Sequence, residues 1–306
     1  MPQRLLPILC ALLALLLTTS AYAAIVEESF DYAPEDLGAI NSNTLNGGIG
    51  FSDDGTNRFW TPVLDPANTN GLPSLVSPGL SLSGVPSSGY AVSRTNKNKW
   101  STLSREISTT SQTSLQANSS MWFSTIVNFK NNRDARVGFA FGTDALDPDS
   151  NPNMGGSSGS GFGFRFGTSI EGRTDYEKIY AMGFNGGSTS LSTDFYDTGY
   201  VEGDGAQDLN YLVVGEIDSS AATDVLNLYV FAEGDAITVS GSPDATLALA
   251  VDVTTFDTIS WNDNQNYGVD EIRLGTDFAS VVPEPSSYAL LLGLATLATT
   301  AIRRPR

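Results

Sequence analysis

Two carboxylates lie two positions apart in the stretch Gly215-Glu216-Ile217-Asp218. Alternate residues of a strand point to the same side of a sheet. Some jelly-roll glycosidases carry a Glu-x-Asp pair followed by a second glutamate on one strand, and the two glutamates act as nucleophile and general acid. That pattern needs a second glutamate where this chain has Ser220 or Ala221. The acid that must stand about 5 Å from the nucleophile is therefore missing. We interpret Glu216 and Asp218 as exposed acids at a strand end entering a turn, and we expect no catalytic residue.

A second candidate site is the loop of residues 144–153, which reads DALDPDSNPN. Its oxygen-bearing side chains recur at every second position, a spacing that suits a Ca²⁺ loop. An EF-hand would need glycine and glutamate where this chain has Pro152 and Ser158. The alternative is a polar turn between strands, because the same residue types favour turns. The candidate calcium ligands are Asp147, Asp149, Asn151 and Asn153.

Aromatic side chains in loop-like stretches could stack on the sugar rings of neutral glycans. Trp60, Trp100, Tyr196 and Tyr200 lie in or beside such stretches. The alternative is that they fill the core, because large aromatic side chains prefer burial. The sequence alone assigns none of them to a binding site.

Histidine is absent from all 306 residues, and the only cysteine is Cys10. Ser-His-Asp and Cys-His catalysis are therefore excluded, as are histidine-ligated zinc and copper. Residues 24–282 contain 12 basic and 33 acidic residues. This negative charge would be repelled by the phosphates of nucleic acid and of anionic membrane surfaces. Divalent cations and neutral glycans remain open as partners.

Short runs of β-branched and aromatic residues, separated by turn-forming residues, fill residues 24–282 and are typical of an antiparallel all-β domain. In residues 161–166 the alternation places Phe162, Phe164 and Phe166 on one face, which we expect to be the core face. Several such strands predict two packed antiparallel sheets, a sandwich or jelly roll in one domain. The predicted strands are Ile25–Tyr32 at an edge, Phe59–Val63, Leu80–Leu82, Tyr90–Ser93, Ser101–Ile107, Trp122–Phe129, Arg136–Phe141, Gly161–Phe166, Lys178–Phe184, Tyr211–Ile217, Val225–Phe231 and Gly268–Gly275.

The N-terminus has the three parts of a secretory signal peptide. Arg4 supplies the positive charge, Leu5–Leu17 forms the apolar region, and Ala21-Tyr22-Ala23 is a small-x-small cleavage site. A lipoprotein anchor at Cys10 fits poorly, because this residue lies inside the apolar run. We expect cleavage after Ala23, which would remove the only cysteine.

The last 25 residues combine a turn, an apolar run and a basic end. The two prolines of the turn keep the chain extended around the glutamate between them. The apolar run has 15 residues and would form a helix about 22 Å long. This is fewer than the roughly 20 residues that comfortably span a bilayer. Arginines after such a run hold its end in the cytoplasm. The three parts are Val282, Pro283, Glu284 and Pro285, then residues 288–302, then Arg303, Arg304 and Arg306.

A Pro-Glu-Pro turn, an apolar stretch and a terminal arginine cluster, in this order, resemble the PEP-CTERM sorting signal of Gram-negative bacteria. In proteins with that signal, a membrane-embedded exosortase recognises the tail and removes it near the motif, releasing the protein to the cell surface or the extracellular matrix. The resemblance implies an exosortase as partner and a transient inner-membrane anchor. Contact with the membrane would be made only through the C-terminal segment before processing.

A second resemblance links residues 25–278 to the concanavalin A-like, laminin-G-like jelly rolls that are often joined to this tail. It rests on Glu28–Tyr32, Leu212–Asp218, Leu226–Val230 and Tyr267–Thr276. It implies an all-β, antiparallel two-sheet jelly-roll sandwich, in agreement with the strand pattern. We therefore divide the chain into a signal peptide (1–23), a β-sandwich domain (24–278), a linker with the Pro-Glu-Pro motif (279–287), a hydrophobic transmembrane-like sorting helix (288–302) and a basic tail (303–306).

Together these features predict an exported protein of the cell surface or extracellular matrix, with a jelly-roll domain in a structural or binding role and no enzymatic activity. The first alternative is a lectin-like module that binds extracellular polysaccharide, with Ca²⁺ as a candidate cofactor. The second alternative is a glycosidase that acts through Glu216. Nucleic acid is not an expected partner.

Overall fold

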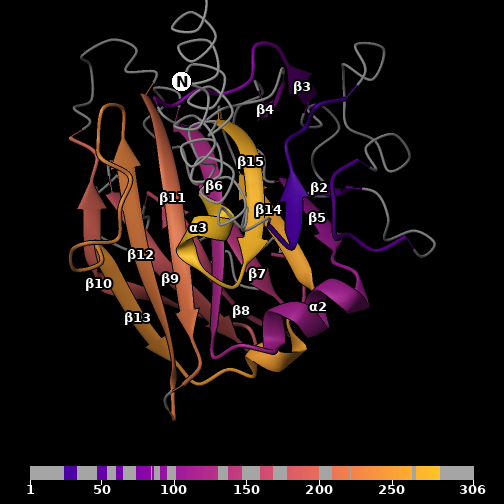
Figure 1. Cartoon of the computed structure of the whole chain (residues 1–306), viewed down its shortest axis with the longest axis vertical. Helices are drawn as coiled ribbons and strands as arrows, with labels where there is room; N and C mark the ends of the chain where they lie inside the picture. The colour runs from indigo at the N-terminus through magenta and orange to yellow at the C-terminus, as the bar shows by residue number, and fades with distance from the viewer. Residues whose placement is uncertain are drawn as a thin grey trace, which may run out of the picture.

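The protein is an all-β sandwich in which two antiparallel sheets pack face to face, as the computed structural model shows (Figure 1). This confirms the predicted fold class. The structure describes residues 24–32, 47–53, 60–64, 74–83, 85, 90–94, 101–129, 137–146, 159–167, 178–199, 209–220, 222–263 and 267–282. The predicted signal peptide with Ala21 and Ala23, the calcium loop of residues 147–153 and all residues from Pro283 onward lie outside these ranges.

The first sheet has eight strands, and β15 is the one that pairs with three others. One edge of β15 pairs with β6, and the other edge is shared by β4 along its first half and β1 along its second half. In order, the strands are β13 (Ala245–Leu249), β12 (Asp224–Ala232), β11 (Leu209–Asp218), β6 (Ser120–Phe129), β15 (Tyr267–Gly275), β4 (Ala91–Arg94) and β3 (Ser74–Val76), with β1 (Val26–Glu28) beside β15.

The second sheet has seven strands, all antiparallel to their neighbours. In order, these are β10 (Ser188–Asp197), β9 (Lys178–Asn185), β8 (Ser160–Phe166), β7 (Val137–Gly142), β14 (Thr258–Asp263), β5 (Ser101–Glu106) and β2 (Thr61–Leu64).

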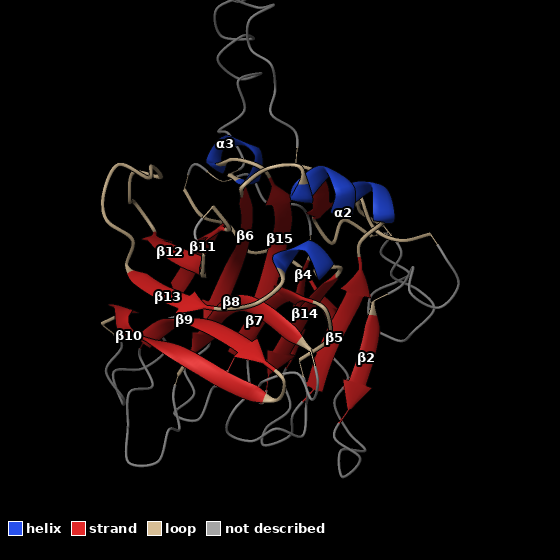
Figure 2. Ribbon diagram, turned by 90° about the horizontal axis from the view of Figure 1, so that it is seen from below, coloured by secondary structure: helices blue, strands red, loops and turns tan. Residues whose placement is uncertain are grey.

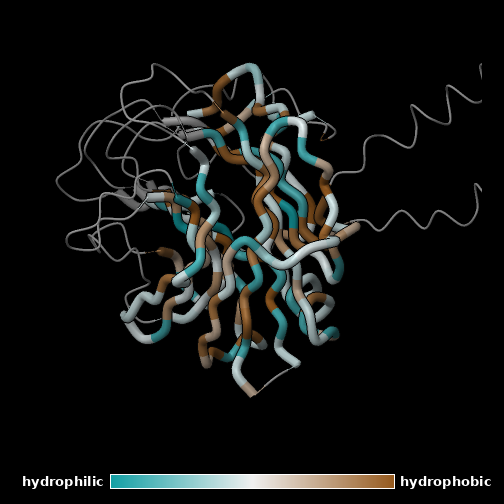
Figure 3. Tube along the Cα trace, turned by 90° about the vertical axis from the view of Figure 1, so that its left-hand side faces the viewer, coloured by the Kyte–Doolittle hydropathy of each residue, from teal (hydrophilic) through white to brown (hydrophobic). Residues whose placement is uncertain are grey.

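The inner faces of the sheets meet in one large apolar core, and hydrophobic and hydrophilic segments alternate along the strands (Figure 3). Phe162, Phe164 and Phe166 all lie in this core, as the alternation predicted. The ring of Phe139 lies 5.7 Å from Phe164 in the same sheet and 5.2 Å from Phe123 in the opposite sheet. These contacts show that period-two patterning identified the core face of β8 correctly.

The outer face of the second sheet is also covered. Ala140, Met182 and Phe184 are buried there together with Leu146, from the segment that follows β7. The backbone of Leu146 accepts a hydrogen bond from Thr102 Oγ1 at 2.8 Å and donates one to Ser260 Oγ at 3.2 Å. This segment therefore crosses the outer face instead of projecting from the strand ends.

Most predicted strands are present, with ends shifted by one or two residues. The prediction for Leu80–Leu82 is wrong, because Leu82 forms only an isolated bridge with Val85. The edge strand expected over residues 25–32 is shorter, because Phe30 takes a positive φ of 54° soon after β1 ends. Four strands were not predicted: β3, β10, β13 and β14.

Helices are short in the described part of the chain and lie outside the sheets (Figure 2). The helix α2 (Thr109–Gln116) begins at Ser108, whose side chain accepts from the Ser111 amide. A 3₁₀ turn occupies Val253–Thr255, and α3 (Phe278–Val281) packs on β15 and β6. Residues 279–282, expected to begin the linker, lie in α3 and its C-cap.

Candidate functional site

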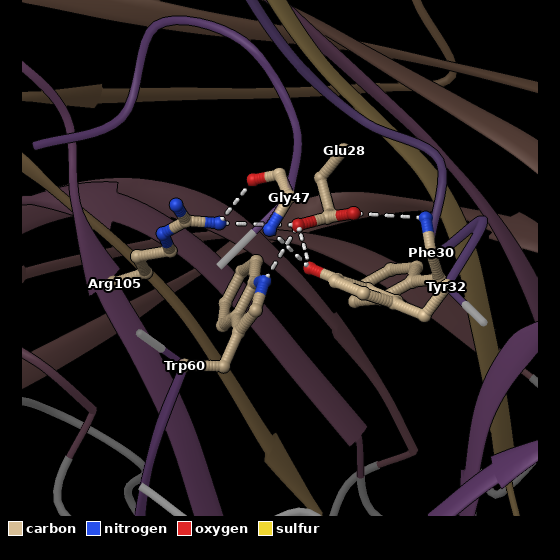
Figure 4. A network of polar contacts seen from close by, with 6 residues as sticks. All are labelled: Glu28, Phe30, Tyr32, Gly47, Trp60 and Arg105. Carbon is tan, nitrogen blue, oxygen red and sulfur yellow. Dashed lines mark hydrogen bonds and ion pairs between the residues drawn. The ribbon is translucent and has the colours of Figure 1, made fainter. Parts of the chain in front are cut away.

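The best-defined polar site is a buried cluster around the carboxylate of Glu28 in β1 (Figure 4). Four groups donate hydrogen bonds to this carboxylate: the Phe30 amide at 2.8 Å, Tyr32 Oη at 2.8 Å, Trp60 Nε1 at 2.9 Å and Arg105 Nη1 at 3.2 Å. Arg105 Nη1 also donates to the Gly47 carbonyl at 2.7 Å. We call Glu28, Phe30, Tyr32, Gly47, Trp60 and Arg105 the Glu28 cluster.

The electrostatics of the Glu28 cluster are dominated by burial. Glu28 is 1% exposed and Arg105 is 4% exposed. Burial raises the pKa of Glu28, and the hydrogen bonds and the charge of Arg105 oppose this rise. Burial lowers the pKa of Arg105, and burial followed by the charge of Glu28 raises the pKa of Tyr32. Every partner of the carboxylate is a donor, an arrangement that suits its ionised form.

The Glu28 cluster joins distant segments, and its ion pair is buried, so we interpret its chemistry as structural. It ties β1 of the first sheet to β5 of the second, with the Arg105 guanidinium 3.9 Å above the Phe51 ring. The sequence showed Glu28 and Tyr32 only as part of a fold resemblance. Its partners were missed because Trp60 and Arg105 lie 32 and 77 residues away along the chain. The spacing of Glu28, Phe30 and Tyr32 was the only available signal.

A second buried site holds two adjacent acids, Asp270 and Glu271, in β15 where its register against β6 shifts. The Asp270 carboxylate accepts from the amides of Leu80 and Glu271, both at 2.9 Å. Arg273 Nη2 bridges Glu271 at 3.2 Å and Glu27 at 2.8 Å. Burial, and then the charge of Glu271, raise the pKa of Asp270 to about 9. The pair fixes the segment at Leu80 to the sheet.

Glu216 and Asp218 lie on the outer face of the first sheet, opposite to the face of core residues Val213 and Ile217. The Glu216 carboxylate accepts from Ser120 Oγ and Asn227 Nδ2, both at 3.2 Å. Asp218 accepts from the Ser220 amide at 2.9 Å, and hydrogen bonds from the side chain and the amide of Ser220 lower its pKa. A general acid needs the opposite shift. The arrangement matches the predicted strand end entering a turn.

A small cavity of about 200 Å³ lies beside the first residues of the predicted calcium loop. The charged residues among those that line it are Arg105, Glu106, Asp144 and Asp257. Burial raises the pKa of Asp257, and the charge of Asp144 adds to the rise. Within the part of the chain that the structure describes, no three acidic side chains converge as a metal site would require. Asp147, Asp149, Asn151 and Asn153 themselves lie outside the described residues.

A larger groove of about 450 Å³ lies where β11 begins and β12 ends. Asn210 Nδ2 donates to the Ser81 carbonyl at 2.6 Å, and Glu233 accepts from the Ser83 amide at 3.0 Å. The residues that line it are Ser81, Leu82, Ser83, Leu209, Asn210 and Glu233. Hydroxyl, amide and carboxylate groups beside an apolar surface can bind a polar, uncharged molecule.

Of the four aromatic residues that were candidates for stacking on sugar rings, the structure describes two. Trp60 is a core residue of the Glu28 cluster, and Tyr196 is partly buried against the core with its ring 6.0 Å from that of Tyr211. Trp100 and Tyr200 lie outside the described residues. The large hydrophobic side chains exposed in the described ranges are Ile49 and Leu209, neither of them aromatic. The core interpretation holds for Trp60.

The C-terminal segment covers an apolar patch on the outer face of the first sheet, and α3 lies in front of the strands in Figure 1. The Phe278 ring lies 5.8 Å from Trp122 and 6.5 Å from Phe231. Val281 is fully buried, and Val282 is 9% exposed. The packed structure therefore extends to the residue immediately before Pro283.

Comparison with family models identifies this tail. Residues 281–306 match the PEP-CTERM protein-sorting motif. The matched segment contains Val282, Pro283, Glu284, Pro285, Arg303, Arg304 and Arg306. The PEP-CTERM motif thus begins at the last residue of α3, inside the packed domain. No described helix has the length and apolar character needed to cross a bilayer.

Solved structures with related chain paths are known, but no curated protein matches the sequence. The botulinum neurotoxin serotype D/C binding domain aligns at 11% identity and a TM-score of 0.40, over 85% of this chain and 52% of that one. Lectin I-B4 from Griffonia simplicifolia, in its metal-free form, aligns at 9% identity and a TM-score of 0.37. The alignment covers 71% of this chain and 100% of the lectin chain. A native glycosidic hydrolase aligns at 11% identity and a TM-score of 0.33. The alignment covers 80% of this chain and 96% of the hydrolase chain. The chain spans about half the length of the toxin domains it resembles.

Proposed function

We propose that this chain is an exported surface or matrix protein of a Gram-negative bacterium, processed by an exosortase and carrying a non-catalytic jelly-roll domain. The observation that supports this most is the PEP-CTERM sorting motif at residues 281–306. The predicted signal peptide of residues 1–23 supplies the export that such processing requires. Residues 288–302 would anchor the protein in the inner membrane only until the cut.

The non-catalytic role is supported by the polar groups of the domain. Glu216 has both carboxylate oxygens engaged, and its neighbour Asp218 is held by a turn. The Glu28 cluster and Asp270 are buried and make structural hydrogen bonds. If the glycosidase alternative were correct, Glu216→Gln would abolish hydrolysis of a glycan by the secreted protein. We expect no hydrolysis from either form.

Mass spectrometry of the released protein tests the proposal. We expect its N-terminal peptide to begin at Ala24 and its C-terminal peptide to lack Arg306. Deleting the exosortase gene of the host should leave the tail in place and the protein in the membrane fraction. Secreted protein with an intact Arg306 in the unmodified host would reject the proposal.

Carbohydrate binding is the second candidate, and the groove beside Asn210 and Glu233 favours it. A glycan array probed with the released protein, with and without Ca²⁺, measures it. If the groove binds a neutral polysaccharide, Asn210→Ala should weaken binding at least tenfold, while Asn227→Ala on the same sheet should not. Loss of binding when Ca²⁺ is chelated would support a calcium site at Asp147, Asp149, Asn151 and Asn153. If the protein binds no glycan on the array, the structural role remains.

A further inference from the structure

Residues 81–83 lie over the outer face of the first sheet and line the groove where β11 begins and β12 ends. Two side chains hold this segment by its backbone. Asn210 Nδ2, in β11, donates to the Ser81 carbonyl at 2.6 Å. Glu233 Oε2, just after β12, accepts from the Ser83 amide at 3.0 Å. Both serines are exposed, so the segment is fixed from below and polar on top.

The amide group of Asn210 is fixed in one orientation. Its Oδ1 accepts from Asn128 Nδ2 at 2.6 Å, so its Nδ2 is the end that faces Ser81. Asn128 is itself held in place, since it is 3% exposed and also donates to the Leu209 carbonyl at 3.5 Å. An amide nitrogen carries two hydrogens. One is bonded to Ser81 and the other makes no bond to a described residue, so Asn210 offers a donor to the groove.

Glu233 offers an acceptor to the same groove. Its Oε2 is bonded to the Ser83 amide, while its Oε1 has no hydrogen-bond partner among the described residues. Ser81 and Ser83, which Asn210 and Glu233 hold, are two residues apart and therefore at most about 7 Å from each other. A donor and an acceptor at this spacing match the hydroxyl groups along one edge of a sugar ring, because each hydroxyl can both accept and donate.

The remaining surface of the groove favours a neutral ligand. Leu209 lines it with a large hydrophobic side chain that is 40% exposed, on which the carbon face of a sugar ring can lie. None of the described residues that line the groove is basic. The carboxylate of an acidic sugar would therefore meet the charge of Glu233 with nothing to offset it, and like charges brought together cost several kcal/mol.

From this geometry we infer that the groove binds a single sugar residue between the donor of Asn210 and the acceptor of Glu233, and that Glu233 makes it select neutral sugars over sugar acids. The side chains that contact the sugar also hold residues 81–83, so a bound sugar restrains this segment. The inference rests on carbohydrate binding, the second candidate function, and adds its contacts, its selectivity and its effect on the fold.

Titration of the released protein with oligomers of glucose, galactose and mannose, and with glucuronic and galacturonic acid oligomers of the same length, tests the selectivity. We expect saturable binding of a neutral oligomer and binding of the matching acid that is weaker by about tenfold or more. Equal or tighter binding of the acid would overturn the inference and leave carbohydrate binding standing. Failure of every oligomer to bind would reject both, while the C-terminal peptide judges the sorting proposal separately.

Glu233→Gln separates the charge from the hydrogen bond, because glutamine keeps an acceptor oxygen. In this variant we expect the neutral oligomer to bind about threefold to tenfold more weakly and the preference over the acid to disappear. Asp224→Asn is the control: it removes the same charge at the opposite end of β12 and should change neither affinity. An undiminished preference for the neutral oligomer in Glu233→Gln would overturn the inference.

Hydrogen exchange of the Ser83 amide measures the effect on residues 81–83. This amide is bonded to Glu233, so a sugar that restrains the carboxylate should slow the exchange. We expect the rate to fall by about threefold or more when the neutral oligomer is saturating. An unchanged rate would contradict the assignment of Glu233 as a ligand contact and overturn the inference.

Discussion

Glu28 is an acid in the core that is held by donors from four directions, one of them a charged guanidinium. Taking such a pair out of water costs several kcal/mol per ion, and only well-aligned hydrogen bonds offset this cost. The cluster provides them: both carboxylate oxygens accept bonds of 2.8–3.2 Å. Removing Glu28 or Arg105 therefore leaves the charge of the other buried without its counter-ion.

We predict that Glu28→Gln and Arg105→Met each lower the free energy of unfolding by about 3–5 kcal/mol, because each leaves an uncompensated buried group. The double variant should lose clearly less than the sum of the two. Urea denaturation of the three variants measures both quantities. Glu27→Gln is the neighbouring control: its pair with Arg273 is partly exposed, so we expect a loss below about 1 kcal/mol. Strict additivity of the two buried substitutions would contradict a coupled cluster.

Asp270 predicts a pH dependence of stability. Its pKa is raised from 3.8 to about 9, so the folded protein keeps a proton that the unfolded chain releases between these values. The stabilisation is complete below about pH 4 and is lost as the pH rises toward 9. We expect Asp270→Asn to make the free energy of unfolding fall less steeply with pH, by up to about 1.4 kcal/mol per pH unit. Denaturation at pH 5, 7 and 9 checks this, and a slope equal to that of the unmodified protein would refute it.

At the scale of elements, β8 shows how small residues allow close strand packing. Phe162, Phe164 and Phe166 fill the core, while Gly161 and Gly163 face the other side. A methyl group on Gly163 would lie 1.8 Å from the Phe139 carbonyl oxygen in β7. Backbone cannot move aside as a flexible side chain can, so this position has no room for any side chain.

We predict that Gly163→Ala lowers the free energy of unfolding by about 2–3 kcal/mol, since overpacking against backbone strains the strand pair. Gly241→Ala is the control, because a methyl group there has no neighbour within 4 Å. Thermal unfolding of both variants gives the comparison. Equal melting temperatures would show that β7 and β8 separate at little cost.

The strands that could be predicted from the sequence are those with a clear set of apolar residues, on the core face of β8 and on both faces of β11. The strand β14 was missed although Ile259 and Trp261 alternate in it, because its other face, with Ser260 and Asn262, is polar yet buried. Asn262 donates there to Thr102 Oγ1 at 2.8 Å. Polar residues buried through hydrogen bonds to another strand look like loop residues in the sequence.

The candidate sites also differ in how far they could be predicted from the sequence. The PEP-CTERM motif is contiguous, so it could be read directly from the sequence, and the family model matches the segment that contains it. The Glu28 cluster combines β1, β5 and the residue before β2, and no spacing rule brings these segments together. Contacts made by the tertiary fold were therefore out of reach of sequence patterns.

The molecule as a whole is strongly acidic, with a net charge of −18 for the full chain. Mutual repulsion of these carboxylates opposes the compact state, and salt screens it with a Debye length of about 8 Å at 0.15 M. We predict that raising NaCl from about 0.01 M to 0.15 M increases the melting temperature at pH 7. The increase should vanish near pH 4.1, where the sequence has no net charge. A decrease at pH 7 would contradict the argument.

The two ends of the described domain both adjoin β15. The Ile25 amide donates to the Leu274 carbonyl at 2.8 Å, and α3 begins soon after Gly275, at the end of the same strand. A surface protein held by its ends would therefore be loaded at one end of the antiparallel pair β1–β15. Force applied in this direction breaks hydrogen bonds one after another, as in opening a zipper, and not all at once as in shear. Peeling would advance from Ile25 and meet its first strong resistance at Glu28, where the buried ion pair fastens the strand to the second sheet.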